Sequence, residues 1–191
     1  MINKVIELLR NAGLVDSTND KIILLGLRRI FAALTDLFIA MVWAMILGDL
    51  FVGILFEVCY SVLRIYVGGF HAKDEKTCKY LTYTSTLVCV FVVFTWSLND
   101  IYTMHCLVIG LVAVILFNAP IENENKPLAK NEKKIYYLYC IGISIAELVV
   151  YFLFVQNEMV LYARTVCIAI LLVVVGVLGE IGRQYNQPKL P

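Results

Sequence analysis

The sequence predicts an all-α integral membrane protein with six transmembrane helices, an N-terminal amphipathic interfacial helix and both termini in the cytoplasm. Three observations support this fold class: the composition, six long apolar stretches, and the placement of the basic residues. Hydrophobic residues make up 61% of the 191 positions and charged residues 16%, whereas soluble domains average roughly 45–50% and about 25%. The composition excludes an ordinary soluble domain and a disordered chain. The formal net charge of +1 gives no indication of nucleic-acid binding.

Residues 1–28 are predicted to lie on the membrane surface as an amphipathic helix. Apolar residues recur at helical spacing at Ile2, Val5, Ile6 and Leu9, with polar residues mostly on the opposite face. The segment lacks the charged start, apolar run and small-residue cleavage site of a signal peptide. We interpret it as a membrane anchor or, alternatively, as a surface that receives a substrate helix.

Six apolar stretches are long enough, at about 1.5 Å per residue, to cross the hydrocarbon core of a bilayer. They cover residues 30–47, 50–67, 80–98, 101–117, 135–155 and 160–178. The stretches are apolar all round rather than alternating, which favours helices over the strands of a membrane barrel. We expect one membrane-embedded domain over residues 1–191, with a core over residues 30–178 and a cytoplasmic tail over residues 179–191.

The connections between these stretches fall into two kinds. Three are tight and carry no basic residue, whereas the connections over residues 68–79 and 118–134 are longer and carry lysines. Fifteen of the 16 Lys and Arg residues fall on the side of these two connections and the termini, and only Arg164 falls on the other side. Because basic residues mark the cytoplasmic face, this side is predicted to be cytoplasmic.

One of the six cysteines differs from the others in its surroundings. The other five lie inside the apolar stretches: Cys59, Cys89, Cys106, Cys140 and Cys167. A cysteine in such a place usually behaves as a small hydrophobic residue. Cys78 instead lies in a charged segment between Lys76 and Lys79, and neighbouring cations favour the thiolate that acts as a nucleophile. We expect no metal or cofactor, because the chain lacks a CxxC pair and a phosphate-binding glycine–lysine loop.

A histidine stands in the same connection as this cysteine. His71 precedes Cys78 by seven residues, which on a straight helix would separate them by about 10.5 Å. Nucleophilic catalysis needs the base within roughly 2.6–3.2 Å of the thiol. The pair can act together only if the segment bends, and Gly68 and Gly69 supply the conformational freedom for a bend. The other histidine, His105, is expected to be packed or hydrogen bonded.

Further polar residues lie within or at the end of the apolar stretches. Arg64 is either an interfacial arginine that snorkels to water or a fixed donor that orients an acidic group or a substrate carbonyl. Glu57, Ser61 and Arg64 share one helix face, which favours a buried polar network. Acidic residues inside a membrane are costly and are therefore functional candidates, and here they are Asp36, Glu57 and Glu147.

The chain resembles the accessory gene regulator B family in its Arg64, its paired Gly68 and Gly69, its His71 and its Cys78, all at that family's spacing. These proteins are membrane endopeptidases that process quorum-sensing peptide precursors in Gram-positive bacteria. The likeness covers essentially the whole chain. It implies Cys78 as the nucleophile, His71 as its base and acid, and Arg64 with the two glycines as residues that shape the site.

The resemblance also implies a mechanism that needs no ATP. Cys78 would attack a carbonyl near the C-terminal region of the precursor, and His71 would protonate the leaving amine. A cysteine within the peptide would then take the acyl group from the thioester and close a thiolactone. A partly dry interface would protect the thioester from water. An oxyanion donor is required, and both Arg64 and backbone amides near Cys78 are candidates.

The expected partners are a precursor peptide with an amphipathic N-terminal helix, the lipid bilayer and, by resemblance, a second copy in a homodimer. We assign Lys133, Lys134 and Glu57 as candidate peptide-binding residues. Three glutamates reduce the net charge over residues 118–134 to +1, which argues against strong binding of acidic groups there. The protein is predicted to be a multi-pass protein of a bacterial cell membrane, with the catalytic segment at the cytoplasmic face.

Two other function classes remain open at this point. A transporter or peptide exporter would use Asp36, Glu57 or Glu147, and six spans fit that class. Against it, the spans lack the matched interruptions by Gly or Pro that mark a transport site. A structural or partner-binding membrane protein would tolerate the loss of both the acids and Cys78.

Overall fold

The computed structural model describes residues 20–70, 72, 74–96, 101–122 and 129–186. Its helices are α2 (Asp20–Leu47), α3 (Leu50–Val67), α4 (Glu75–Thr95), α5 (Ile101–Asn118), α6 (Lys130–Gln156) and α7 (Val160–Asn186). All six are long and apolar enough to cross a membrane, and no strand occurs in the described ranges. The predicted all-α fold with six candidate spans is confirmed. Of the predicted surface helix, residues 1–19 lie outside the described residues.

Four helices extend beyond the apolar stretches that predicted them. Helix α2 begins at Asp20, α4 at Glu75 and α6 at Lys130, and α7 continues to Asn186. Hydropathy locates the part of a helix that suits lipid, whereas the backbone hydrogen bonds continue into polar sequence. The early start of α4 matters most, because it places Cys78 inside a helix rather than in a connection.

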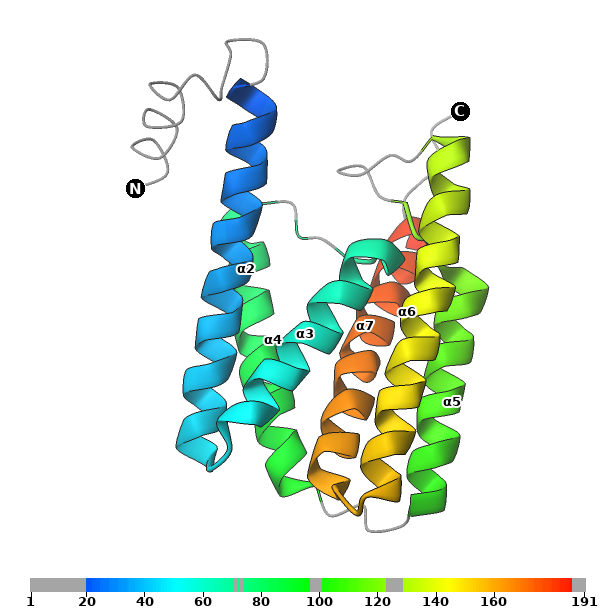
Figure 1. The fold of residues 1–191 in the computed structure, drawn as a ribbon. Helices are drawn as coiled ribbons and strands as arrows, with labels where there is room; N and C mark the ends of the chain where they lie inside the picture. The colour runs from blue at the N-terminus through cyan, green and yellow to red at the C-terminus, as the bar shows by residue number, and fades with distance from the viewer. Residues whose placement is uncertain (1–19, 71, 73, 97–100, 123–128, 187–191) are drawn as a thin grey trace.

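Consecutive helices run in opposite directions, so the connections alternate between two ends of the bundle (Figure 1). One end, here called the tight end, holds the links α2–α3, α4–α5 and α6–α7. The other, the site end, holds the starts of α2, α4 and α6 and the ends of α3, α5 and α7. Arg164 lies near the start of α7 at the tight end. The other described basic residues lie near the helix termini of the site end, in agreement with the charge count.

Helix α7 is the most enclosed helix and packs against α3, α4, α5 and α6. In its most apolar segment 56% of the residues are buried, against 11% in that of α2. Helix α3 packs on its other side against α2, where Gly53 meets Ala40 and Ala44 with no room for a side chain. Small residues allow such close approach of helices in a membrane. Helix α3 is thus held between α2 and α7, and its C-terminal end reaches the site end.

The second histidine has the role that the sequence predicted for it. His105 of α5 lies with its Nδ1 2.9 Å from the hydroxyl of Tyr151 on α6. Tyr151 is fully buried. The pair joins two helices inside the bundle, so His105 is a hydrogen-bonded structural histidine.

Candidate functional site

The chain bends sharply where α3 ends at the site end. Gly68 has φ +80° and Gly69 has φ +118°, a region that L-residues rarely adopt and glycine adopts readily. A side chain at Gly68 would collide with the carbonyl oxygen of Ile121. The Ile121 N–H donates to the carbonyl of Val67 over 2.8 Å, which forms an isolated parallel bridge between Gly68 and Ile121. The two glycines therefore bend the chain two residues before His71 in the sequence.

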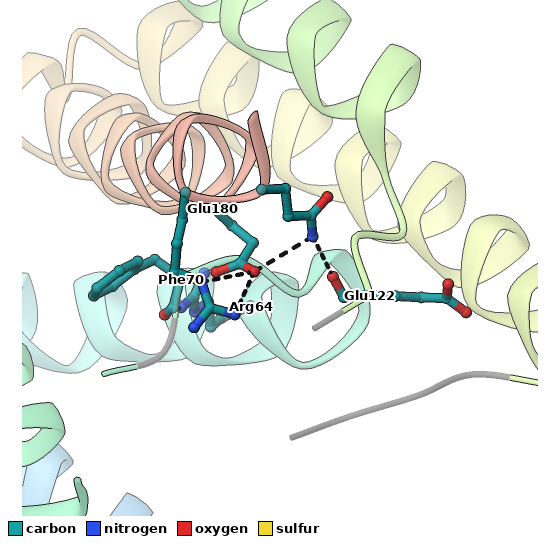
Figure 2. A network of polar contacts seen from close by, with 6 residues as sticks. Arg64, Phe70, Glu122 and Glu180 are labelled. Carbon is teal, nitrogen blue, oxygen red and sulfur yellow. Dashed lines mark hydrogen bonds and ion pairs between the residues drawn. The ribbon is translucent and has the colours of Figure 1, made fainter. Parts of the chain in front are cut away.

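Arg64, in the last turn of α3, turns back to bind the segment that follows its own helix. Its Nη1 donates to the carbonyl oxygen of Gly68 over 2.6 Å, and its Nη2 donates to the carbonyl oxygen of Phe70. The N–H of Phe70 donates to the carbonyl oxygen of Gly176 on α7 over 2.8 Å. Figure 2 shows the contact between Arg64 and Phe70. The acceptors of Arg64 are main-chain carbonyls of this chain, whereas the sequence had suggested an acidic group or a substrate carbonyl.

Two glycines enclose the guanidinium of Arg64. A side chain at Gly69 would collide with Arg64 Nη1, and a Cβ at Gly176 would lie 2.6 Å from the same atom. We call the unit formed by Arg64, Gly68, Gly69, Phe70 and Gly176 the arginine clamp. Its effect is to fix both the carbonyl and the N–H of Phe70, the residue that directly precedes His71 in the chain.

Cys78 lies in the first turns of α4, just after a well-formed helix start. Asp74 is the N-cap, and its carboxylate accepts the N–H of Thr77 over 2.9 Å. Hydrogen bonds from the Thr77 side chain and then its backbone hold the pKa of the Asp74 carboxyl below its ordinary value. The N–H of Cys78 donates to the Asp74 carbonyl over 3.1 Å, and the Cys78 side chain is half-buried. The thiol therefore sits near the positive end of the α4 dipole.

His71 lies outside the described residues. Phe70 is bound by Arg64 and Gly176, and Asp74 caps α4.

Titratable side chains of α2, α3 and α4 lie within electrostatic range of one another. Tyr60 of α3 interacts electrostatically with Asp36, Glu57, Arg64 and Cys78. Asp36 of α2 interacts in the same way with Lys79 of α4. Cys78 is therefore close to polar groups of α3. Tyr60 was not anticipated, because a tyrosine within an apolar stretch carries no signal that distinguishes it from a packing residue.

Glu57 faces a groove between α2 and α3. It is 4% exposed and accepts a hydrogen bond from the hydroxyl of Ser61, while its second oxygen has no hydrogen-bond partner among the described residues. The groove has a volume of about 290 Å³ and is lined by Ile30, Ala33, Leu34, Leu37, Glu57, Val58, Ser61 and Val62. The Glu57–Ser61 part of the predicted network is present, whereas Arg64 is directed to the glycines.

The two lysines assigned to peptide binding stand in the first turns of α6 at the site end. Lys133 forms an ion pair with Glu122 over 2.9 Å, with both side chains partly exposed. Lys134 is exposed. The structure brings both lysines to the same end of the bundle as Arg64 and Cys78. It pairs Lys133 with a carboxylate of this chain.

Helix α7 contributes polar residues that the sequence interpretation placed in a tail. Glu180 is fully buried and accepts hydrogen bonds from Arg183 over 2.8 Å and Gln184 over 3.3 Å. Gln184 also donates to the carbonyl oxygen of Glu122 over 2.7 Å (Figure 2). Gly176, Glu180 and Gln184 recur at intervals of four residues. This spacing places the three residues on one helix face, and it was the sequence signal that the helix continues past residue 178.

The fold and the site define a multi-pass membrane protein whose polar and titratable residues gather at one end of six helices. The sequence matches the model of the accessory gene regulator B family over residues 2–177, so the chain belongs to that family, as the resemblance predicted. Family members are generally membrane proteases of propeptides, and membership implies involvement in quorum-sensing peptide processing. No curated protein and no solved structure gave a significant match. The described residues hold no group of three or more His, Cys, Asp or Glu that could bind a metal ion.

Proposed function

We propose that this chain is a membrane cysteine endopeptidase that releases the C-terminal part of a quorum-sensing precursor peptide. The observation that carries the proposal is the position of Cys78 at the start of α4, half-buried and in electrostatic range of Tyr60. It shares that end of the bundle with the arginine clamp, whose Phe70 directly precedes His71 in the chain. A thiol in this setting is a nucleophile candidate rather than a packing cysteine.

The proposed reaction is acyl transfer in two steps. The Cys78 thiolate adds to a peptide carbonyl, the C–N bond breaks, and His71 delivers the proton to the leaving amine. The released product is the C-terminal fragment, and the retained product is a thioester on Cys78. A cysteine thiol of the peptide then attacks the thioester, which regenerates Cys78 and closes a thiolactone. No net oxidation occurs, and the thioester conserves the energy that ring closure needs.

The arginine clamp supports this chemistry by fixing the backbone next to His71. Orientation of a base and a nucleophile contributes strongly to rate, because small displacements from the reactive geometry are expensive. Gly68 and Gly69 allow the turn, and Arg64 holds it. In this scheme Arg64 is a positioning residue, and its guanidinium is already engaged by two carbonyl groups of the chain. That engagement favours backbone amides near Cys78 as the oxyanion donor.

The proposal assigns peptide binding to two regions of the site end. The groove beside Glu57 is apolar with an acidic wall, which suits one face of an amphipathic helix of the precursor. Lys133 and Lys134 lie at the start of α6 and would meet acidic groups of the peptide. The site end would face the cytoplasm of a bacterial cell, and the protein would act as a homodimer in the bilayer.

The test is cleavage of the precursor peptide by the full chain in membranes, with the C-terminal fragment and the thioester adduct detected by mass. Cys78→Ala is expected to abolish both products. Cys89→Ala is the matched control, because Cys89 lies on the same helix and is also half-buried, and this variant is expected to cleave normally. Full cleavage by Cys78→Ala would refute the proposal.

One structural observation keeps a transport role as the second candidate. Glu147 of α6 is 6% exposed, and neither of its carboxylate oxygens has a hydrogen-bond partner among the described residues. Such a group inside a membrane is a candidate for ion or proton binding. Glu147→Gln should leave cleavage of the precursor intact if the chain is a peptidase alone. Loss of product export with normal cleavage in this variant would show that transport is a separate function.

A further inference from the structure

One face of α7 binds the two segments of the site end that follow α3 and α5. Gly176, Glu180 and Gln184 lie on this face at intervals of four residues, which on an α-helix brings them into one row. Gly176 binds the segment after α3, because its carbonyl oxygen accepts the N–H of Phe70 over 2.8 Å. Gln184 binds the segment after α5 through the carbonyl of Glu122. The two segments meet each other at the Gly68–Ile121 bridge.

Gly176 contributes twice to this arrangement. Its carbonyl oxygen holds Phe70, and the space left by its missing side chain accommodates the guanidinium of Arg64. A Cβ at position 176 would lie 2.6 Å from Arg64 Nη1 and 3.3 Å from Arg64 Cζ. These atoms form the far end of a flexible side chain, so an alanine here can be accommodated if Arg64 moves. That movement would break the hydrogen bonds from Arg64 to Gly68 and Phe70.

We propose that Gly176 is a positioning residue of the peptidase reaction, which acts through Arg64 and Phe70 on the chain that leads to His71. The inference rests on the proposed function, in which His71 is the base for Cys78. The consequence is that the C-terminal half of α7, far from Cys78 in the sequence, sets the geometry of the catalytic segment.

The experiment compares Gly176→Ala with Gly182→Ala in the full chain. Both glycines lie on α7, and a Cβ at Gly182 would meet nothing within 4 Å, so both changes alter helix propensity alike but only one displaces Arg64. The first readout is the alkylation rate of Cys78 as a function of pH, followed for that residue by peptide mass. The second is the kcat and KM of precursor cleavage, and thermal unfolding reports on the fold.

We expect Gly176→Ala to lose the part of the alkylation profile that His71→Ala also removes. We expect its kcat to fall on the order of 10²-fold with KM unchanged, while Gly182→Ala retains both the profile and kcat. A profile altered by His71→Ala but not by Gly176→Ala would overturn this inference alone. A profile that His71→Ala leaves unaltered would overturn the proposed function, and this inference with it.

The double variant Arg64→Ala/Gly176→Ala tests whether the effect passes through Arg64, also in the case that Gly176→Ala alone does not fold. Arg64→Ala removes the atoms that the new methyl group would meet. We therefore expect the double variant to fold, cleave and react with alkylating reagent as Arg64→Ala does, because coupled residues are not additive. A double variant with a further loss of folding or of kcat would overturn the inference.

Discussion

The two ends of the helix bundle provide hydrogen-bond partners for the backbone at their helix ends in different ways. At the tight end, α3 begins directly after α2 with a conventional cap, in which Asp49 accepts the N–H of Phe51 over 2.8 Å. The hydroxyl of Tyr162 donates to the other oxygen of Asp49 over 2.8 Å. Both contacts lie at the starts of helices, α3 and α7.

At the site end the chain leaves α3 through a bend at Gly68 and Gly69, and α4 begins at Glu75. The carbonyl groups of the bend lose their helical partners, and unpaired backbone groups are costly away from water. Arg64 donates to the carbonyl oxygens of Gly68 and Phe70, and the carbonyl oxygen of Gly176 accepts the N–H of Phe70. The arginines of the two ends therefore differ in what they stabilise. Arg164 joins two helices, whereas Arg64 shapes a segment that no helix or sheet would hold.

The largest expected difference between the ends is in catalysis by the two arginine variants. Arg64→Ala should lower kcat for precursor cleavage on the order of 10²-fold, because the backbone before His71 is no longer fixed. Arg164→Ala removes a 3.0 Å hydrogen bond to the carbonyl of Val93 and should lower the free energy of unfolding by about 1.5–3 kcal/mol with kcat unchanged. Cleavage rates per folded protein and thermal unfolding check both expectations.

Equal effects of these two substitutions on kcat would contradict the distinction between the ends. Arg64→Lys sharpens it further. A lysine keeps the charge but lacks the planar pair of donors, so kcat should remain low if the hydrogen bonds to the two carbonyls matter. Full activity of Arg64→Lys would mean that charge alone is needed.

Substitution of the lysines of α6 is expected to have a smaller effect. It distinguishes a role in peptide binding from a role in stability at the site end. Lys133→Ala and Lys134→Ala should each raise KM several-fold with little change in kcat if both residues meet the peptide. Lys133→Ala should also lower stability by at most about 1 kcal/mol, because it removes a partly exposed ion pair with Glu122. A rise in KM for neither variant would remove both from the binding site.

The smallest effect is expected at the cap of α4 and depends on pH. The pKa of Asp74 is lowered in the fold by its hydrogen bonds to Thr77. The carboxylate therefore contributes stability above its unfolded pKa of about 3.9, and this contribution disappears as the pH falls through the lower folded value. Asp74→Asn should lower the unfolding temperature at pH 7 but not at pH 2.

Thermal unfolding of Asp74→Asn and of the parent chain at several pH values measures this difference directly. A difference that persists or grows at low pH would contradict the assignment of Asp74 as a charged cap. Because Cys78 follows this cap by one helical turn, the same variant also shows how far fraying of α4 affects cleavage.

Much of the fold could be predicted because the bilayer imposes a simple rule on the sequence. A spanning helix needs about 20 apolar residues, and the six stretches found by that rule correspond to α2–α7. The sorting of basic residues between the two ends followed from the same alternation. The family was identifiable from Arg64, the paired glycines, His71 and Cys78, because those few polar residues stand out in an apolar chain.

The helix ends and the support of the site could not be predicted in this way. Polar residues are compatible with both a helix and a connection, so hydropathy set the start of α4 too late and the end of α7 too early. Tyr60 and Gly176 belong to residue types that usually serve packing. Their roles arise only from neighbours that are distant in sequence, such as Arg64 for Gly176.

The sequence by itself determined the class of protein, the number of spans and the residues that stand out chemically. The reason is that each polar residue is costly in lipid, so the spans and the exceptional polar residues are visible from the sequence alone. Only the tertiary structure decided what Arg64 binds and which helix supports it. The reason is physical: a guanidinium can satisfy several acceptors, and the acceptors it meets depend on where α7 places the backbone of Gly176. The residues that neighbour Arg64 in the sequence do not determine where Gly176 lies.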